Sequence, residues 1–348
     1  GYIIARLASE AGLQAVVCAL KETGGLKGDA AIAASRWRES GGEVLAWPLD
    51  SLEGYDLVFD ALLGTGLDRA PAGNYAEAVD LINRSGKAVV AVDIPSGLNA
   101  DSGVALGCAV KADITVTFIG NKRGLFTADG ADHAGDVFFS DLETPSTVRD
   151  SEADHGILIQ ESLLLELLPA RRRNTHKGSY GWVLGVGGNH GMSGAVRLAG
   201  EAALRSGAGK VTLATRSEHA GLVNLACPEL MVRAAEDAGQ LETLLGEVSV
   251  VVTGTGLGQT GWSERMLRAC LQSAAPVVID ADGLNGVAKD PDGLRRDNWI
   301  MTPHPAEAGR LLACSAAEIQ SDRVGSALRL AQRYQAVVTL KGCGTVVA

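Results

Sequence analysis

Aromatic residues are scarce in this sequence, where they make up 4% of 348 positions, whereas glycine occurs 44 times. This combination is typical of α/β proteins with many tight turns between strands and helices, and it argues against an all-β or a disordered chain. The hydrophobic content of 46% is ordinary for a soluble globular protein. For a chain of this length we expect roughly two domains.

Paired cysteines, long apolar runs and excess positive charge are also lacking. No two of the six cysteines form a C-x-x-C pair, which favours scattered reduced thiols in a cytoplasmic protein over a metal or disulfide framework. The sequence shows no signal peptide and no apolar run long enough for a transmembrane helix. The net charge of −10 argues against duplex nucleic acid and anionic membranes as partners, but it leaves room for a small anionic ligand.

Strand and helix patterns alternate along both halves of the chain. In the first half, apolar runs over residues 55–60 and 87–93 predict strands, and residues 28–42 and 74–86 predict helices. Such alternation predicts an α/β fold with a parallel sheet and helices on both faces. Residues 142–156 are polar and lose this periodicity. We therefore predict a first domain over residues 1–145, a linker over 146–156 and a second domain over 157–348.

Aspartates follow two apolar strands of the first half. Asp60 ends one of these runs, and Asp93 ends the next and precedes the stiff turn "IPSG". Ligands of open α/β sheets bind outside the carboxyl ends of the strands, so these carboxylates and the Ser96 hydroxyl can bind a hard cation. One carboxylate can also serve as a general base, and the alternative is that both only cap the turns that follow.

Two glycine-rich turns are ambiguous when taken alone. The turn from Gly64 to Ala70 places backbone N–H groups beside Arg69 and can hold a phosphate, but an ordinary turn fits the same residues. In the second half, "LGVGGNHG" resembles the dinucleotide fingerprint G-x-G-x-x-G, except that His190 stands in place of the last glycine. We therefore reject that match and expect a strand-to-helix turn near a pocket.

The strongest signals of the second half follow its later strands. Glycines between Gly254 and Gly258 allow a ligand to approach the backbone closely, and Asp280 ends a strongly apolar run. His304 stands between two prolines, which favours a functional role over a purely structural one. Lys341 opens the turn "KGCGT", where glycine N–H groups and the Thr345 hydroxyl can hold phosphate oxygens.

Together these motifs resemble those of the bifunctional NAD(P)H-hydrate repair enzymes. The segments "DALLGTGL" and "VDIPSGLNADSG" are similar to the epimerase domain of that family. The segments "HKGSYGWVLGVGGNHGMSGA", "GTGLG", "DADGLN", "TPHPAEAGRLL", "SDR" and "LKGCGT" are similar to its dehydratase domain. The resemblance covers essentially the whole chain, and it implies a Rossmann-like three-layer domain followed by a ribokinase-like three-layer domain.

The resemblance implies repair of nicotinamide nucleotides. The first domain would interconvert the R and S hydrates of NAD(P)H with K⁺ as cofactor, and the second would convert the S hydrate to NAD(P)H with Mg²⁺ and at the expense of ADP. Phosphoryl transfer turns a hydroxyl into a better leaving group, and a kinase-like site supplies the positioning that this step needs. We also expect a cytoplasmic homo-oligomer whose partners are the hydrate and ADP, with no nucleic acid or membrane.

The resemblance also assigns roles to residues of this sequence. Asp60 and Ser96 would bind the potassium ion, and Asp93 would be the catalytic acid–base group and bind the hydrate. The hydrate would also contact Gly64, Thr65, Gly66, Leu67, Asp68, Arg69 and Ala70 in the first domain, and Ala195, Gly256, His304, Pro305, Ala306, Glu307, Ala308, Gly309 and Arg310 in the second. The ADP would contact Lys341, Gly342, Cys343, Gly344 and Thr345.

Two elements of the family pattern are not found in the sequence. A phosphate loop rich in asparagine and glycine should precede Gly1, and the dehydratase anion hole with its general-base aspartate should follow residue 348. We therefore expect a chain truncated at both ends that lacks the dehydratase base. The alternatives are a ribokinase-like sugar or vitamin kinase, which leaves the first half unexplained, and a non-catalytic nucleotide-binding protein.

Overall fold

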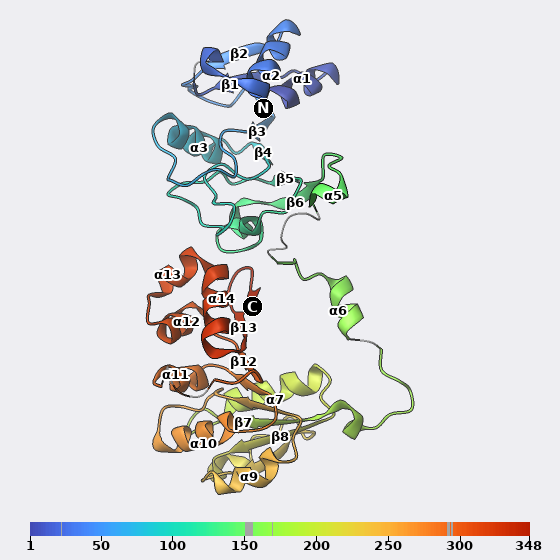
Figure 1. The fold of residues 1–348 in the computed structure, drawn as a ribbon, viewed down its shortest axis with the longest axis vertical. Coiled ribbons are helices and arrows are strands. Elements are labelled where there is room, and N and C mark those ends of the chain that lie inside the picture. Colours follow the sequence, from blue (N-terminus) through green and yellow to red (C-terminus); the bar gives the residue numbers. More distant parts are fainter. Residues whose placement is uncertain (22, 150–155, 169, 291–292, 294) are drawn as a thin grey trace. The chain divides into compact units, whose positions relative to one another are not determined.

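The computed structural model describes residues 1–21, 23–149, 156–168, 170–290, 293 and 295–348 (Figure 1). The chain divides into two compact units, Gly1–Asp154 and His155–Ala348. Residues 150–155 of the predicted linker lie outside the described residues. Among the described helices, none is both long and apolar enough to cross a membrane.

The described strands of the N-terminal unit run parallel and form two sheets. One sheet pairs β1 (Val16–Ala19) with β2 (Glu43–Ala46), and the other has the order β3 (Leu57–Asp60), β4 (Ala88–Val92), β5 (Ile114–Phe118) and β6 (Asp136–Ser140). The helices are α1 (Tyr2–Glu10), η1 (Thr23–Gly25), α2 (Gly28–Glu39), α3 (Asn74–Arg84), η2 (Arg123–Phe126), α4 (Gly130–His133) and α5 (Ser146–Arg149). The parallel pairing agrees with the prediction, but β2 pairs only with β1 among the described strands, so the unit has two sheets where one was expected.

Helix α3 anchors the strand that leads to Asp93. Val79 and Ile82 are three residues apart and therefore lie on one face of the helix, where they are buried with Val89 and Ala91 of β4. This apolar contact fixes the position of the carboxyl end of β4 within the unit.

Among the described residues of the C-terminal unit, eight strands form one sheet. Its order is β14-β13-β12-β11-β10-β7-β8-β9, and all neighbouring pairs are parallel except β13 with β14. The strands are β7 (Trp182–Val186), β8 (Lys210–Thr215), β9 (Met231–Ala234), β10 (Val250–Thr253), β11 (Val277–Ile279), β12 (Trp299–Met301), β13 (Val337–Leu340) and β14 (Val346–Val347). The helices are α6 (Glu161–Leu167), η3 (Lys177–Tyr180), α7 (Ser193–Arg205), α8 (Ser217–Ala220), α9 (Gly239–Leu245), α10 (Gly261–Leu271), α11 (Asp282–Ala288), α12 (Pro305–Leu312), α13 (Ala316–Ser321) and α14 (Arg323–Tyr334).

Both faces of this sheet are covered by helices, as the sequence predicts. Leu184 of β7 belongs to the large core that includes Met266 of α10 and Leu330 of α14. Leu213 of β8 belongs to a separate core with Val196 of α7. Because the central strands β7, β10, β11 and β12 are buried or half-buried along their length, their sequences are almost continuously apolar. The strand order then brings the carboxyl ends of β10, β11, β12 and β13 side by side.

Candidate functional site

Asp60 and Ser96 meet in the N-terminal unit although they are 36 residues apart in the sequence. The backbone N–H of Ser96 donates to Oδ2 of Asp60 over 2.7 Å, and its hydroxyl donates to Oδ1 over 2.6 Å. Each residue is only 1% exposed. Burial raises the pKa of the Asp60 carboxyl, while the hydrogen bonds from Ser96 act in the opposite direction. The structure thus brings together the two residues predicted to bind a potassium ion.

The atoms around this pair suit a hard cation. The backbone N–H of Leu63 donates to the Ser96 hydroxyl over 2.8 Å, and the carbonyl oxygen of Leu63 lies 3.2 Å from the same hydroxyl. In the part of the chain that the structure describes, no three His, Cys, Asp or Glu side chains gather as a metal-binding group. A carboxylate, a hydroxyl and a carbonyl are oxygen donors of the kind that K⁺ and other hard cations prefer.

Asp93 directly follows β4 and is held in an unusual backbone conformation. Its φ of 73° lies in the left-handed region, which is uncommon for residues other than glycine. Its N–H donates to the carbonyl of Val116 over 2.8 Å. Its Oδ1 accepts the N–H of Phe118 over 3.0 Å and lies 3.3 Å from the Thr117 hydroxyl. The carboxylate is therefore fixed at the carboxyl ends of β4 and β5.

Lys122, which the sequence did not single out, forms an ion pair with Asp93. Its Nζ contacts Oδ1 of Asp93 and donates to the carbonyl of Phe118 over 2.8 Å. The side chain of Lys122 is 15% exposed and that of Asp93 is 26% exposed. The lysine lies 29 residues after the aspartate, and the parallel pairing of β4 with β5 brings the two together. A lysine four residues beyond a strand end was the only available signal.

The predicted phosphate loop, Gly64 to Ala70, begins one residue after Leu63 and therefore lies next to Ser96. Most of the loop is exposed. Among the described residues, no hydrogen bond or ion pair joins Arg69 to Asp93. The structure thus places the start of this loop at the Asp60–Ser96 pair and leaves Arg69 in solvent.

In the C-terminal unit, residues that follow β11 and β12 converge on Lys341, which follows β13. Its Nζ lies 2.6 Å from Oδ1 of Asp280, which follows β11, and 3.9 Å from Oε2 of Glu307 in α12. The Thr302 hydroxyl donates to the same oxygen of Asp280 over 2.8 Å. The backbone N–H of Lys341 donates to the carbonyl of Pro303 over 2.8 Å. The turn predicted to bind ADP is therefore joined to the segment predicted to bind the hydrate.

His304 caps helix α12, so part of its role is structural. Its Nδ1 accepts the N–H groups of Ala306 and Glu307 over 3.1 and 3.4 Å, and Glu307 Oε2 accepts the N–H of His304 over 2.8 Å. This reciprocal arrangement is a capping box, with Pro305 at the first helical position. Because an N–H can only donate, Nδ1 is the acceptor and the neutral ring carries its proton on Nε2. The side chain is 47% exposed, and its Nε2 lies 3.4 Å from Oε1 of Glu307.

The residues of α12 that were predicted to contact the hydrate do not all face the carboxyl ends of the strands. Ala308 is fully buried in the large apolar core. Gly309 is buried as well, and a Cβ added there would lie 2.6 Å from the carbonyl oxygen of Cys314. Arg310 Nη1 donates to Oδ1 of Asn285 over 2.9 Å. A helix of 3.6 residues per turn cannot present six consecutive side chains to one side, so Ala308 and Gly309 face the protein interior.

Gly256 and Ala195, both predicted to contact the hydrate, lie against each other. Gly256 has a φ of 60°, and a Cβ added there would fall 2.9 Å from the Cβ of Ala195. Asn189, which was not predicted as a site residue, donates its backbone N–H to the carbonyl of Gly256 over 2.8 Å. Its buried amide donates to the carbonyl of Leu257 over 3.1 Å and to the hydroxyl of Thr260 over 3.1 Å. Asn189 therefore ties the glycine turn after β7 to the glycine loop after β10.

The side chain of Arg323 contacts backbone carbonyls of the turn that was predicted to bind ADP. It is 1% exposed, and burial lowers its pKa. Its Nη2 lies 3.3 Å from the backbone carbonyls of Leu340, Lys341 and Gly344. The motif "SDR" contributed to the sequence resemblance, but nothing in it indicates this contact with carbonyls 17 or more residues away.

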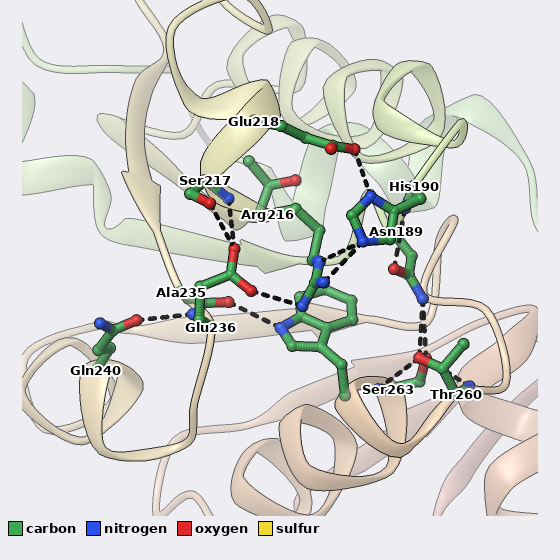
Figure 2. Close-up of polar contacts among 12 residues, drawn as sticks. Asn189, His190, Arg216, Ser217, Glu218, Ala235, Glu236, Gln240, Thr260 and Ser263 are labelled. Carbon is green, nitrogen blue, oxygen red and sulfur yellow. Dashed lines mark hydrogen bonds and ion pairs between the residues drawn. The ribbon is translucent and has the colours of Figure 1, made fainter.

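A second polar network follows β7, β8 and β9, and it includes His190 (Figure 2). The Nε2 of His190 accepts from Nη2 of Arg216 over 2.7 Å, and its Nδ1 lies 2.5 Å from Oε1 of Glu218. Arginine can only donate, so the ring proton is on Nδ1 and points to Glu218, and this hydrogen bond lowers the pKa of Glu218. Arg216 also pairs with Glu236 at 2.6 Å and lies over the ring of Trp262 at 5.2 Å. His190 thus orders this turn instead of serving a dinucleotide fingerprint.

Two family models match the chain, one in each unit. Residues 1–124 match the family described as YjeF-related protein N-terminus, and residues 183–348 match the family described as NAD(P)H-hydrate dehydratase. A ribokinase-like superfamily protein from Enterococcus faecalis V583 is similar in structure, with a TM-score of 0.50 and 24% identity over 54% of this chain and 67% of that chain. This likeness shows the fold, which is the ribokinase-like fold that the sequence predicted.

Curated relatives match the chain from end to end. The bifunctional NAD(P)H-hydrate repair enzyme Nnr of Coxiella burnetii is 43% identical over 347 residues, which cover 100% of this chain and 71% of the relative. The enzyme of the same name from Escherichia coli is 44% identical over 352 residues, which cover 100% of this chain and 67% of the relative. The chain therefore belongs to the family of bifunctional NAD(P)H-hydrate repair enzymes.

Proposed function

We propose that this chain repairs hydrated NAD(P)H by two reactions. The N-terminal unit interconverts the R and S hydrates, and the C-terminal unit dehydrates the S hydrate to NAD(P)H with consumption of ADP. The observation that carries the proposal is the 43% identity to a bifunctional repair enzyme along the whole chain. A sugar or vitamin kinase would leave the Asp60–Ser96 pair and Asp93 without a purpose, so that alternative explains less of the chain.

In the N-terminal unit, Asp93 is the proposed acid–base group for epimerisation. Its carboxylate is held at a strand end and is 26% exposed, so a substrate can reach it. Asp60 and Ser96, with the carbonyl of Leu63, would hold K⁺. When bound, this ion would compensate the negative charge of the buried Asp60 carboxylate.

In the C-terminal unit, the turn from Lys341 to Thr345 would bind the phosphates of ADP through its glycine N–H groups and the lysine charge. Gly256 and the Nε2 of His304 would line the hydrate side. Mg²⁺, when bound with the nucleotide, would neutralise phosphate charge during phosphoryl transfer. The cytoplasmic location and the homo-oligomeric state stay predictions.

The proposal is tested by incubating the chain with a mixture of NADH hydrates. Chromatography follows the ratio of R to S hydrate, and the absorbance of reduced nicotinamide follows the return of NADH with and without ADP. We expect the epimers to equilibrate in K⁺ buffer and to do so more slowly in the Asp93→Asn variant. Calorimetry with ADP tests the nucleotide site separately from turnover. A wild-type chain that leaves the epimer ratio unchanged would overturn the epimerase half. In a separate incubation with ATP and a vitamin alcohol, accumulation of the phosphorylated alcohol would favour the kinase alternative.

A further inference from the structure

We propose that Lys122 is a second catalytic residue of the N-terminal unit, an inference that rests on the proposed epimerase function. Lys122 gives a proton to the ring nitrogen of the hydrate while Asp93 takes a proton from its hydroxyl group. The two side chains form an ion pair, and each keeps one site for hydrogen bonding to the substrate.

The two oxygens of Asp93 have different surroundings. Oδ1 faces the N–H of Phe118, the hydroxyl of Thr117 and the ammonium of Lys122. Among the described residues, no hydrogen bond reaches Oδ2. Donors that surround Oδ1 hold the carboxylate in one orientation, so Oδ2 is the atom that can take a proton from a substrate.

The ammonium group of Lys122 also keeps one N–H donor that has no acceptor among the described residues. An ammonium has three N–H donors and no acceptor. Two of them serve Oδ1 of Asp93 and the carbonyl of Phe118, and among the described residues no further acceptor takes the third. Because the side chain is 15% exposed, the third donor is available to a molecule that enters beside Asp93.

The chemistry of the hydrate needs such a pair. Addition of water to the enamine of a dihydropyridine places the hydroxyl group on the carbon next to the ring nitrogen. When Oδ2 of Asp93 removes the hydroxyl proton, the O–H electrons form a C=O bond and the C–N bond breaks. The C–N electron pair goes to the ring nitrogen, which takes a proton from Lys122, and the ring opens to an aldehyde.

Reversal of the same step gives the other epimer. Rotation about the C–C bond next to the aldehyde presents its opposite face to the nitrogen. The nitrogen then attacks the carbonyl carbon and returns its proton to Lys122, while protonated Asp93 returns its proton to the oxygen. Both residues recover their initial charges, and the step needs no oxidant, reductant or co-reactant.

The test compares Lys122→Met and Lys122→Arg with Lys111→Met, which replaces an exposed lysine of the same unit. The rate of epimer exchange is measured by chromatography on purified R hydrate. Loss of a general acid is expected to lower kcat by about 100-fold or more in Lys122→Met, with KM changed by less than about threefold. Lys122→Arg keeps the positive charge beside Asp93 but is too weak an acid to give up its proton, so it should be similarly slow.

Two outcomes would overturn the inference while leaving the proposed function intact. The first is an active wild-type chain whose Lys122→Arg variant exchanges epimers at the wild-type rate. The second is a slow, folded Lys122→Ala variant that methylammonium does not rescue, because an external acid should replace a missing proton donor but not a missing structural contact. If the wild-type chain itself does not exchange epimers, the proposed epimerase function is wrong, and the role of Lys122 is wrong with it.

Discussion

The guanidinium group of Arg323 lies directly against Gly342. A Cβ added to Gly342 would fall 2.6 Å from Nη1 of Arg323, and the φ of Gly342 is 145°. The turn that is proposed to bind ADP therefore packs against the buried guanidinium group of Arg323. A side chain at position 342 would clash with that group. Replacement of the arginine should affect both the stability of the unit and its nucleotide site.

Arg323→Met is expected to destabilise the C-terminal unit. The change removes the guanidinium donor that lies near the carbonyls of Leu340, Lys341 and Gly344, and loss of a buried charged donor costs on the order of 3 kcal/mol of unfolding free energy. Urea denaturation measures this loss, and calorimetry should show ADP binding weakened by about tenfold or more. Arg329→Met, at an exposed position of the same helix, is the control and should cost less than about 0.5 kcal/mol. Equal losses in both variants would contradict the role given to Arg323.

Substitution of His304 can separate its cap from its proposed ligand contact. His304→Ala removes the acceptor for the N–H groups of Ala306 and Glu307, and the loss of a helix cap costs about 1 kcal/mol. His304→Asn keeps a side-chain acceptor and should be close to wild type in thermal denaturation. Both variants should bind the S hydrate more weakly, because both lack the imidazole Nε2. Hydrate binding unchanged in both would assign His304 to the cap alone.

The buried carboxyl of Asp60 should make the N-terminal unit sensitive to pH. Burial raises its pKa, so between the ordinary carboxyl pKa and the raised value the folded chain binds more protons than the unfolded chain. The free energy of unfolding should therefore fall as the pH rises through this window, and K⁺ should restore part of it. In Asp60→Asn, urea denaturation should show neither this slope nor a response to K⁺, with tetramethylammonium as the control cation. The same pH slope in wild type and variant would show that another group is responsible.

Asn189 is expected to position the two glycine-rich loops of the C-terminal unit. Asn189→Ala removes the amide hydrogen bonds to Leu257 and Thr260, and the loss of two such bonds should cost about 1–3 kcal/mol of unfolding free energy. Asn189→Asp keeps the size of the side chain but replaces the donor with an acceptor, and should be at least as damaging. Calorimetric titration with the S hydrate should show weaker binding in both variants. Wild-type binding with reduced stability would limit Asn189 to a structural role.

Periodicity and the rule on strand ends predicted much of the fold and of the polar residues at the strand ends. Asp60, Asp93, Asp280 and Lys341 all follow apolar strands, and parallel pairing collects such positions at one edge of a sheet. The identity of the family followed from the order of the motifs and is shown by the relatives. The separation of the N-terminal strands into two sheets was not predicted, because a strand pattern does not say which neighbour a strand pairs with.

The sequence did not identify the residues whose roles depend on side-chain contacts between loops. Lys122 and Asn189 reach their partners only after neighbouring strands have paired, 29 and 68 residues away along the chain. Arg323 is charged and would ordinarily be expected at the surface, whereas in the structure its guanidinium is buried against backbone carbonyls and the side chain of Gln320. Ala308 was assigned because the family resemblance implied a hydrate site over His304 to Arg310, whereas in the structure its side chain is buried in the apolar core.

The strand order of the C-terminal unit has a consequence for synthesis of the chain on the ribosome. From β11 onwards, each new strand joins the edge left by the strand made before it, so the sheet grows in the direction of translation as far as β14. Asp280 emerges first, Glu307 next and Lys341 last, so the cluster at the strand ends is completed in that order. Until β13 arrives, β12 is an open edge with unpaired backbone groups, which is a template for aggregation. A ribosome that stalls between these strands would therefore release an aggregation-prone sheet rather than a slower enzyme.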